Sequence, residues 1–240
     1  MLNALIFSLA TRLPKKEAEN FRNLVEAYET KQFKKGLKLA DSILKKYPSN
    51  GETQAMKGII LNSLNKKAEA YELVKAGIKN DMKSHVCWHV YGLLYRSDLN
   101  YKEASKCYLN ALKIDGGNQN ILRDLSWLQI QMRDAGGFLN TRRRLLELRP
   151  GLRTNWVAFA LATYLRGDYG GAFEIIARYL ETAPEGSGAE VYEDSELSLF
   201  QNSCLMAGGR GPEALAHLEE VRERVVDQHS WLVRRALLLT

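Results

Sequence analysis

The sequence contains few of the residues that mark several classes of protein. Its 240 residues include only five prolines and three cysteines, and no two cysteines stand in a paired spacing such as C-x-x-C. An odd number of widely separated cysteines, here Cys87, Cys107 and Cys204, is typical of a reduced, intracellular protein and not of a disulfide framework. No apolar run approaches the roughly 18 residues of a membrane span, and residues 1–13 lack the basic start and the cleavage site of a signal peptide. A disulfide scaffold and a membrane protein are therefore excluded, and a cytoplasmic location is expected.

Residues for catalysis are also scarce. The chain has four histidines, and we recognise no Ser/His/Asp set, Cys/His nucleophile or close carboxylate pair. The most metal-like group is Asp81, His85 and His89, spaced four residues apart. Ser84 is the expected N-cap of the helix that holds the histidines, which places Asp81 outside that helix and leaves the two histidines without an assured third ligand. The sequence predicts no enzyme, no resident cofactor and no metal site.

Helix-forming residues and an uneven charge are what the chain does have. Leu, Ala, Lys and Glu dominate, 45% of residues are hydrophobic and 26% are charged, as expected for a soluble helical protein. Residues 1–83 hold 16 basic and 9 acidic side chains, a net charge of +7. Residues 84–156 hold 11 and 6, a net +5, whereas residues 157–240 hold 7 and 13, a net −6. The N-terminal two-thirds therefore presents either a solvated basic helix face or a surface for phosphates.

A repeat of 34 residues organises the chain. Its fullest copy has small and aromatic residues at fixed offsets: Trp88, Gly92, Tyr95, Tyr101, Ala104, Tyr108 and Ala111. The same frame, moved by whole repeats, meets equivalent residues at Gly58, Ala70, Leu122, Leu125, Trp156, Gly167, Tyr169 and Ala172. This is the tetratricopeptide pattern, in which small residues stand where two helices approach and large residues fill the gaps between them. We predict an all-α fold, a right-handed superhelix of tetratricopeptide helix pairs with the best-formed units between Gly51 and Pro184.

The frame also gives boundaries along the chain. A sixth unit needs an insertion of eight residues, because Glu213-Ala214 stands 42 residues after Gly171-Ala172. We therefore expect an atypical segment at 1–13, five units over 14–184, a loop insertion at 185–195, a sixth unit at 196–228 and an apolar segment at 229–240. Within the sixth unit, Gly208 and Gly209 are expected to end one helix and Pro212 to lie in the first turn of the next. The segment 229–240 holds Trp231 and its apolar neighbours, and we expect it to fold back, to pair with another chain or to stay exposed. Self-association or poor solubility is the expected outcome.

The first helices of such units line one face, which the frame allows us to name. The predicted partner-binding residues of this concave face are Ile59, Asn62, His89, Leu93, Arg96, Arg123, Trp127, Ile130, Leu161 and Tyr164. A clamp for a peptide's terminal carboxylate needs Lys and Asn here, but apolar residues stand at two central places. The face suits a helix or a folded partner, although some of its residues could instead pack inside their own helix pair.

Lysines mark a second surface, on the outer helix of the first unit. They are Lys31, Lys34, Lys35, Lys38, Lys45 and Lys46, and the first four are spaced three to four residues apart on one helix face. Two interpretations remain open, a solvated helix face or contact with the phosphates of ribosomal RNA, which requires only positive charge on one side.

Longer strings of residues identify a family. The stretch from Lys66 to Asp134, with SHVCWHVYGLL and LQIQMRD, resembles the auxiliary subunit of the N-terminal acetyltransferase A complex, as do LPKKEAENF, YETKQFKKGLK and GETQAMKGIILN. The resemblance runs from about Leu13 to about Leu218. It implies a non-catalytic scaffold that holds the catalytic acetyltransferase subunit and positions it at the ribosome, where nascent chains are acetylated. The alternative is a generic tetratricopeptide adaptor that binds a partner helix or a chaperone.

The chain differs in two ways from what an acetyltransferase or a full-length family member would show. The acetyl-CoA signature R/Q-x-x-G-x-G/A has its nearest match at Arg133 to Phe138, which fails at the last position, so the chain is expected to bind no acetyl-CoA. Family members are several times longer, and their later repeats make much of the contact with the catalytic subunit. The chain is therefore expected to be a truncated form.

Overall fold

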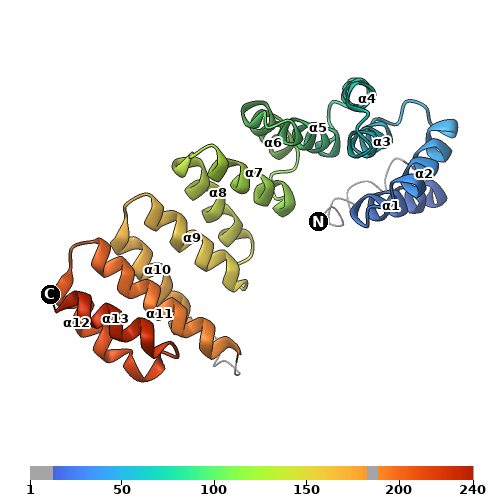
Figure 1. The fold of residues 1–240 in the computed structure, drawn as a ribbon. Coiled ribbons are helices and arrows are strands. Elements are labelled where there is room, and N and C mark those ends of the chain that lie inside the picture. The colour runs from blue at the N-terminus through green and yellow to red at the C-terminus, as the bar shows by residue number, and fades with distance from the viewer. Residues whose placement is uncertain (1–12, 183–188, 240) are drawn as a thin grey trace. The chain divides into compact units, whose positions relative to one another are not determined.

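Every regular element that the structure describes is a helix. The computed structural model describes residues 13–182 and 189–239, and this part of the chain contains no strand. Its contacts divide it between Asp134 and Ala135 into two compact units, each described by itself. The first holds α1 (Lys15–Glu29), α2 (Phe33–Lys46), α3 (Gly51–Ser63), α4 (Lys67–Asn80), α5 (His85–Ser97), α6 (Tyr101–Ile114) and α7 (Gln119–Gln131) (Figure 1). The second holds α8 (Ala135–Leu148), α9 (Arg153–Leu165), α10 (Tyr169–Thr182), α11 (Ala189–Ala207), α12 (Gly211–Glu220), the 3₁₀ turn η2 (Arg222–Arg224) and α13 (Gln228–Leu238).

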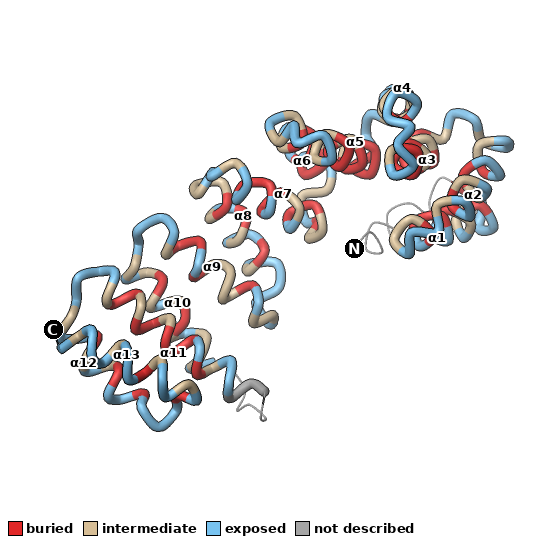
Figure 2. Tube along the Cα trace, viewed as in Figure 1, coloured by how far each residue is buried: buried red, intermediate tan, exposed pale blue. Residues whose placement is uncertain are grey.

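The first six helices pack in the pairs that the repeat predicts. In the first unit α1 contacts α2, α3 contacts α4 and α5 contacts α6, while α1 also contacts α3 and α3 contacts α5. Burial follows these contacts (Figure 2), and within the first unit α3 and α5 carry the fullest sets of buried residues. The prediction of an all-α tetratricopeptide fold is confirmed. No described helix is long and apolar enough to cross a membrane.

Two of the predicted boundaries fall partly outside the described residues. These are residues 1–12 of the N-terminal segment, residues 183–184 at the end of the five units and residues 185–188 of the predicted insertion. The remainder of that insertion, residues 189–195, lies in α11 and not in a loop.

Helix starts recur at the repeat spacing. Asn50, Ser84 and Asn118 stand 34 residues apart, and each side chain accepts a hydrogen bond from the backbone N–H three residues later. Such N-caps satisfy a donor that has no partner inside the helix. The next position in the frame is Leu152, which makes no side-chain cap. The expected cap at Ser84 is confirmed, and Pro212 lies in the first turn of α12 as expected.

Helix ends recur with the same period. Residues with positive φ stand in every turn between paired helices, at Lys31, Asn65, Leu99, Arg133, Gly167 and Gly209, with φ of 58°, 63°, 60°, 55°, 82° and 71°. The first five are 34 residues apart, and the sixth follows after 42, as the insertion requires. After α5 the N–H of Asn100 bonds to the carbonyl of Tyr95 (2.9 Å) and that of Leu99 to Arg96 (3.0 Å). This is the Schellman arrangement, which satisfies the last carbonyls of a helix.

Glycine is required where helices of one pair approach most closely. A Cβ on Gly92 would stand 2.4 Å from the ring of Tyr108, which is fully buried. A Cβ on Gly51 would stand 2.4 Å from the carbonyl oxygen of Gly77. Real Cβ atoms do not approach other atoms so closely, so these glycines set the distance between α3 and α4 and between α5 and α6.

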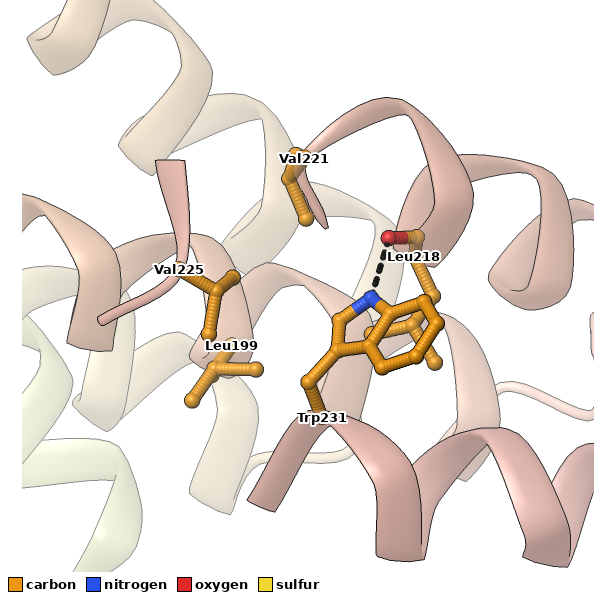
Figure 3. Packing of buried hydrophobic residues seen from close by; sticks show 5 residues of the cluster. All are labelled: Leu199, Leu218, Val221, Val225 and Trp231. Carbon is orange, nitrogen blue, oxygen red and sulfur yellow. Dashed lines mark hydrogen bonds between the residues drawn. The ribbon is translucent and has the colours of Figure 1, made fainter. Parts of the chain in front are cut away.

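The last helix of the second unit, α13, packs against α12, and Trp231 is its buried residue in that contact. Trp231 is 4% exposed and packs with Leu199, Leu218, Val221 and Val225 (Figure 3). Its indole N–H donates to the carbonyl of Leu218 at 2.8 Å. The apolar side chains that stay exposed on α13 and just after it are Leu232, Val233, Leu237 and Leu239. The segment therefore folds back through Trp231, and the expected self-association stays a prediction.

Candidate partner-binding site

A cavity in the first unit opens along its first helices. It has a volume of about 520 Å³, within the range of about 300–1,000 Å³ that is typical of ligand sites. We call it the first-helix groove. It is lined by Tyr28, Glu29, Lys31, Phe33, Ser63, His89, Leu93, Arg96, Asn120, Arg123, Asp124 and Trp127.

Half of the predicted partner-binding residues line this groove. They are His89, Leu93, Arg96, Arg123 and Trp127. They come from α5 and α7. These are the first helices of two successive repeats, so residues 34 positions apart lie at equivalent places on them. Whether a partner binds them stays a prediction.

The other five predicted residues lie elsewhere. Ile59 is 3% exposed and belongs to the core, the packing interpretation that the sequence left open. Asn62 donates to the hydroxyl of Ser97 (3.1 Å), and Ile130 is exposed. Leu161 and Tyr164 are in the second unit, where the ring of Tyr164 packs against Tyr169 (5.0 Å between centroids) and Phe200 (5.6 Å).

A partly buried carboxylate, that of Asp124, links two helices at the groove. Nε2–H of His89 donates to its Oδ2 (2.8 Å), and the guanidinium of Arg96 donates to its Oδ1 (2.9 Å). Burial acts to raise the pKa of Asp124, but the bond from His89 and the charge of Arg96 outweigh burial, and the pKa lies below its ordinary value of 3.8. The carboxylate is therefore ionised at neutral pH, and it fixes the side chains of α5 against α7.

Tyr28 completes the opposite side of the groove. Burial raises its pKa, while the nearby charge of Arg96 acts in the opposite direction. Tyr28 lies on α1 but is close enough to sense both Arg96 and Asp124. The groove therefore joins side chains from α1, α5 and α7.

Sequence reasoning missed Tyr28 and Asp124, although the repeat frame held a signal for both. Tyr28 stands 34 residues before Asn62, in the same register as Arg96. Asp124 stands 34 residues after Val90, which is fully buried. A carboxylate in a register that is otherwise apolar requires buried partners.

The six lysines of the predicted basic face differ in their surroundings. Lys46 forms an ion pair with Glu17 (2.7 Å). The other five are exposed and make no ion pair with any residue that the structure describes: Lys31, Lys34, Lys35, Lys38 and Lys45. Asp41, which lies among them on α2, is bonded to Lys57 (2.7 Å) and so does not neutralise them. We call these five lysines the basic face.

The histidines and thiols do not gather into a reactive site. His85 Nε2 is 3.9 Å from Asp115, and burial lowers the pKa of His85, so that its ring is neutral at pH 7. The described residues hold no group of three metal-ligating side chains. Burial raises the pKa of Cys87 and of Cys107 to about 12 and that of Cys204 to about 11. These thiols are protonated and inert near neutral pH.

Comparisons with known proteins find NatA auxiliary subunits among the relatives. A family model described as the N-terminal TPR repeats region of Psidin matches residues 19–135. The chain is 50% identical over 234 residues to the N-terminal acetyltransferase A complex auxiliary subunit NAA15 of Arabidopsis thaliana, covering 97% of this chain and 26% of that protein. It is 49% identical over 218 residues to the human N-alpha-acetyltransferase 16, NatA auxiliary subunit, covering 90% of this chain and 25% of that protein.

A solved structure shows the same relationship. The structure described as Naa15/Naa10 bound to HypK-THB contains a chain that is 41% identical, with a TM-score of 0.80, covering 94% of this chain and 34% of that one. This chain spans about a quarter of the length of the two relatives. The resemblance that the sequence motifs indicated is confirmed.

Proposed function

We infer that this chain is a non-catalytic scaffold for an N-terminal acetyltransferase, because its repeats resemble the N-terminal repeats of NatA auxiliary subunits. In this role it holds the catalytic subunit and positions it at the ribosome in the cytoplasm, where nascent chains are acetylated. The observation that carries the proposal is the identity of about half of all residues over almost the whole chain, together with a matching fold. The acetyl-CoA would be bound by the catalytic partner.

The basic face supports the ribosomal part of the proposal. Lys34, Lys38 and Lys45 fall at intervals of four and seven residues, which places them in one stripe along α2. Because these ammonium groups lack ion pairs within the described part of the chain, phosphate contact would cost no existing interaction. Each phosphate that a lysine neutralises releases condensed counterions, and binding should weaken steeply with salt.

Ribosome co-sedimentation tests this face. The variant carries Lys34→Glu, Lys35→Glu, Lys38→Glu and Lys45→Glu, and we expect it to lose most of the binding of the parent chain, roughly tenfold or more at low salt. The matched control carries Lys79→Glu, Lys83→Glu, Lys102→Glu and Lys113→Glu, which are also exposed in the first unit. It has the same net charge as the test variant and should keep more of the binding. Equal loss in both would show that only net charge matters, and no loss in the test variant would show a merely solvated face.

Association with the catalytic subunit is measured separately. The chain is mixed with the purified acetyltransferase subunit and analysed by size-exclusion chromatography with light scattering. Co-elution supports the scaffold role. Acetylation of a peptide N-terminus by this chain alone would contradict it.

A further inference from the structure

We propose that the first-helix groove binds a short peptide segment that carries an acidic side chain next to an aromatic or aliphatic one. This deepens the proposed scaffold function and rests on it only in assuming that the chain works by binding partners. The segment would belong to a partner protein and would lie across α5 and α7.

The charged residues of the groove favour a ligand with a carboxylate. Asp124 already accepts from His89 and Arg96, so the charge of Arg96 is matched inside the protein. Lys31 and Arg123 also line the groove, are exposed, and make no ion pair within the described chain. Two unmatched cations at the edge of a cavity favour an anionic group, and Arg123 can hold a carboxylate through two parallel hydrogen bonds.

The apolar residues of the groove favour an apolar side chain next to the acidic one. Trp127 lines it with 59% of its surface exposed, and Phe33 and Leu93 lie beside the same opening. Large aromatic rings that stay exposed in a cavity are typical anchors for a partner's apolar side chain. Arg123 and Trp127 are one helical turn apart on α7, so an acidic and an apolar side chain would be held at neighbouring places.

Polar atoms in the groove favour a peptide over a nucleic acid. Asn120 makes no side-chain hydrogen bond within the described residues, and its amide offers one donor group and one acceptor, as a peptide bond does. His89 is 2% exposed and its Nδ1 has no partner in the described part of the chain. Buried polar atoms are rarely left without a hydrogen bond.

The test is a titration followed by fluorescence anisotropy, with the full chain and a fluorescein-labelled peptide, Gly-Glu-Leu-Phe-Glu-Gly. We expect saturable binding in the micromolar range. A matched peptide with Gln in place of Glu should bind about tenfold more weakly, as should one with Ser in place of Leu and Phe. A labelled oligouridylate of similar length, titrated in the same way, should not bind.

Variants assign the binding to the groove. Arg123→Glu should weaken peptide binding about tenfold and Trp127→Ala about fivefold, whereas Lys102→Glu, an exposed charge reversal on α6, should bind as the parent does. Circular dichroism melts show whether each variant folds, and Arg123→Gln is a milder substitute if Arg123→Glu does not.

The proposal is wrong if the peptide does not bind, if the Gln peptide binds equally, if Arg123→Glu has no effect, or if only the oligouridylate binds. Co-elution with the acetyltransferase subunit and ribosome co-sedimentation are separate measurements, so failure of the scaffold function would be recognised independently.

Discussion

Asp124 shows how one side chain can hold a groove together. Its carboxylate lies at a position where the preceding repeat has a buried valine, and it is stable there because two donors from α5 reach it. Removing a carboxylate would leave the buried Nε2 of His89 without its acceptor. The same residue therefore shapes the groove and contributes to the stability of the first unit.

Asp124→Asn should lower the free energy of unfolding by about 1–3 kcal/mol at neutral pH, because charge-assisted hydrogen bonds are lost. The free energy of unfolding of this variant should also fall less than that of the parent as the pH is lowered. The pKa of Asp124 is lower in the folded chain than its ordinary 3.8, so its contribution is present above pH 3.8 and is lost as the pH falls through the folded value. Urea unfolding from about pH 6 to about pH 3 measures both effects.

Asp41→Asn is the control for this measurement. Asp41 forms an ion pair with Lys57 but its side chain is 60% exposed, and exposed pairs contribute about 0–1 kcal/mol. If the two variants lose equal stability, the buried bonds of Asp124 do not hold the helices as described.

The helix ends are the most regular elements of the molecule. Each turn between paired helices needs one residue in the left-handed region, and the chain supplies a glycine, an asparagine or a less suitable residue for this place. Left-handed backbone costs an ordinary L-residue about 1–2 kcal/mol, whereas Asn and Gly adopt it more readily. The geometry of the turn is thus fixed by the two helices it joins, and some repeats tolerate a strained residue there.

Leu99→Asn should raise the free energy of unfolding by about 0.5–1 kcal/mol. Leu99 has φ of 60° and is 70% exposed, so its replacement removes strain and loses little burial. Asn65 occupies the same place one repeat earlier. Thermal unfolding followed by circular dichroism measures the change, and Gly167→Ala, at the equivalent turn of the second unit, should act in the opposite direction. A lower melting temperature for Leu99→Asn would show that Leu99 makes contacts that outweigh its strain.

At the scale of the whole molecule, stability should be a sum of local terms. Helices of a repeat array contact only their neighbours in sequence, so a defect in one place weakens its own pair and the adjacent ones. The described residues fit this rule, since most contacts run between consecutive helices, and α3 also contacts α1 and α5. Trp231 is the strongest single link of α13 to this array.

Trp231→Ala should therefore destabilise the second unit by about 3–5 kcal/mol and leave the first unit unchanged. Hydrogen exchange with mass spectrometry should show faster exchange in α11, α12 and α13 and no change in α3 and α5. Leu232→Ala is the matched control, because Leu232 is 57% exposed and exposed substitutions change stability by about 0.5 kcal/mol or less. Loss of protection in α3 and α5 as well would show that the array unfolds as one cooperative body.

Much of this could be predicted from the sequence because the fold is made of short-range contacts. The 34-residue spacing of Gly58, Gly92 and their aromatic partners defined the helix pairs, and Ser84 and Pro212 marked helix starts. The resemblance to the auxiliary subunits was visible in continuous strings. Five of the ten predicted partner-binding residues line the groove.

What the sequence could not show is how side chains from different repeats meet. The sequence by itself determined the repeat, the helix pairs and the family, since periodicity and capping are local properties of consecutive residues. Only the tertiary structure decided that Asp124 joins His89 to Arg96, that Lys46 pairs with Glu17 and that Trp231 is buried on α12. Each of these contacts joins residues that are 13 to 35 positions apart, and its geometry depends on how helices of successive repeats pack, which no single stretch of sequence encodes.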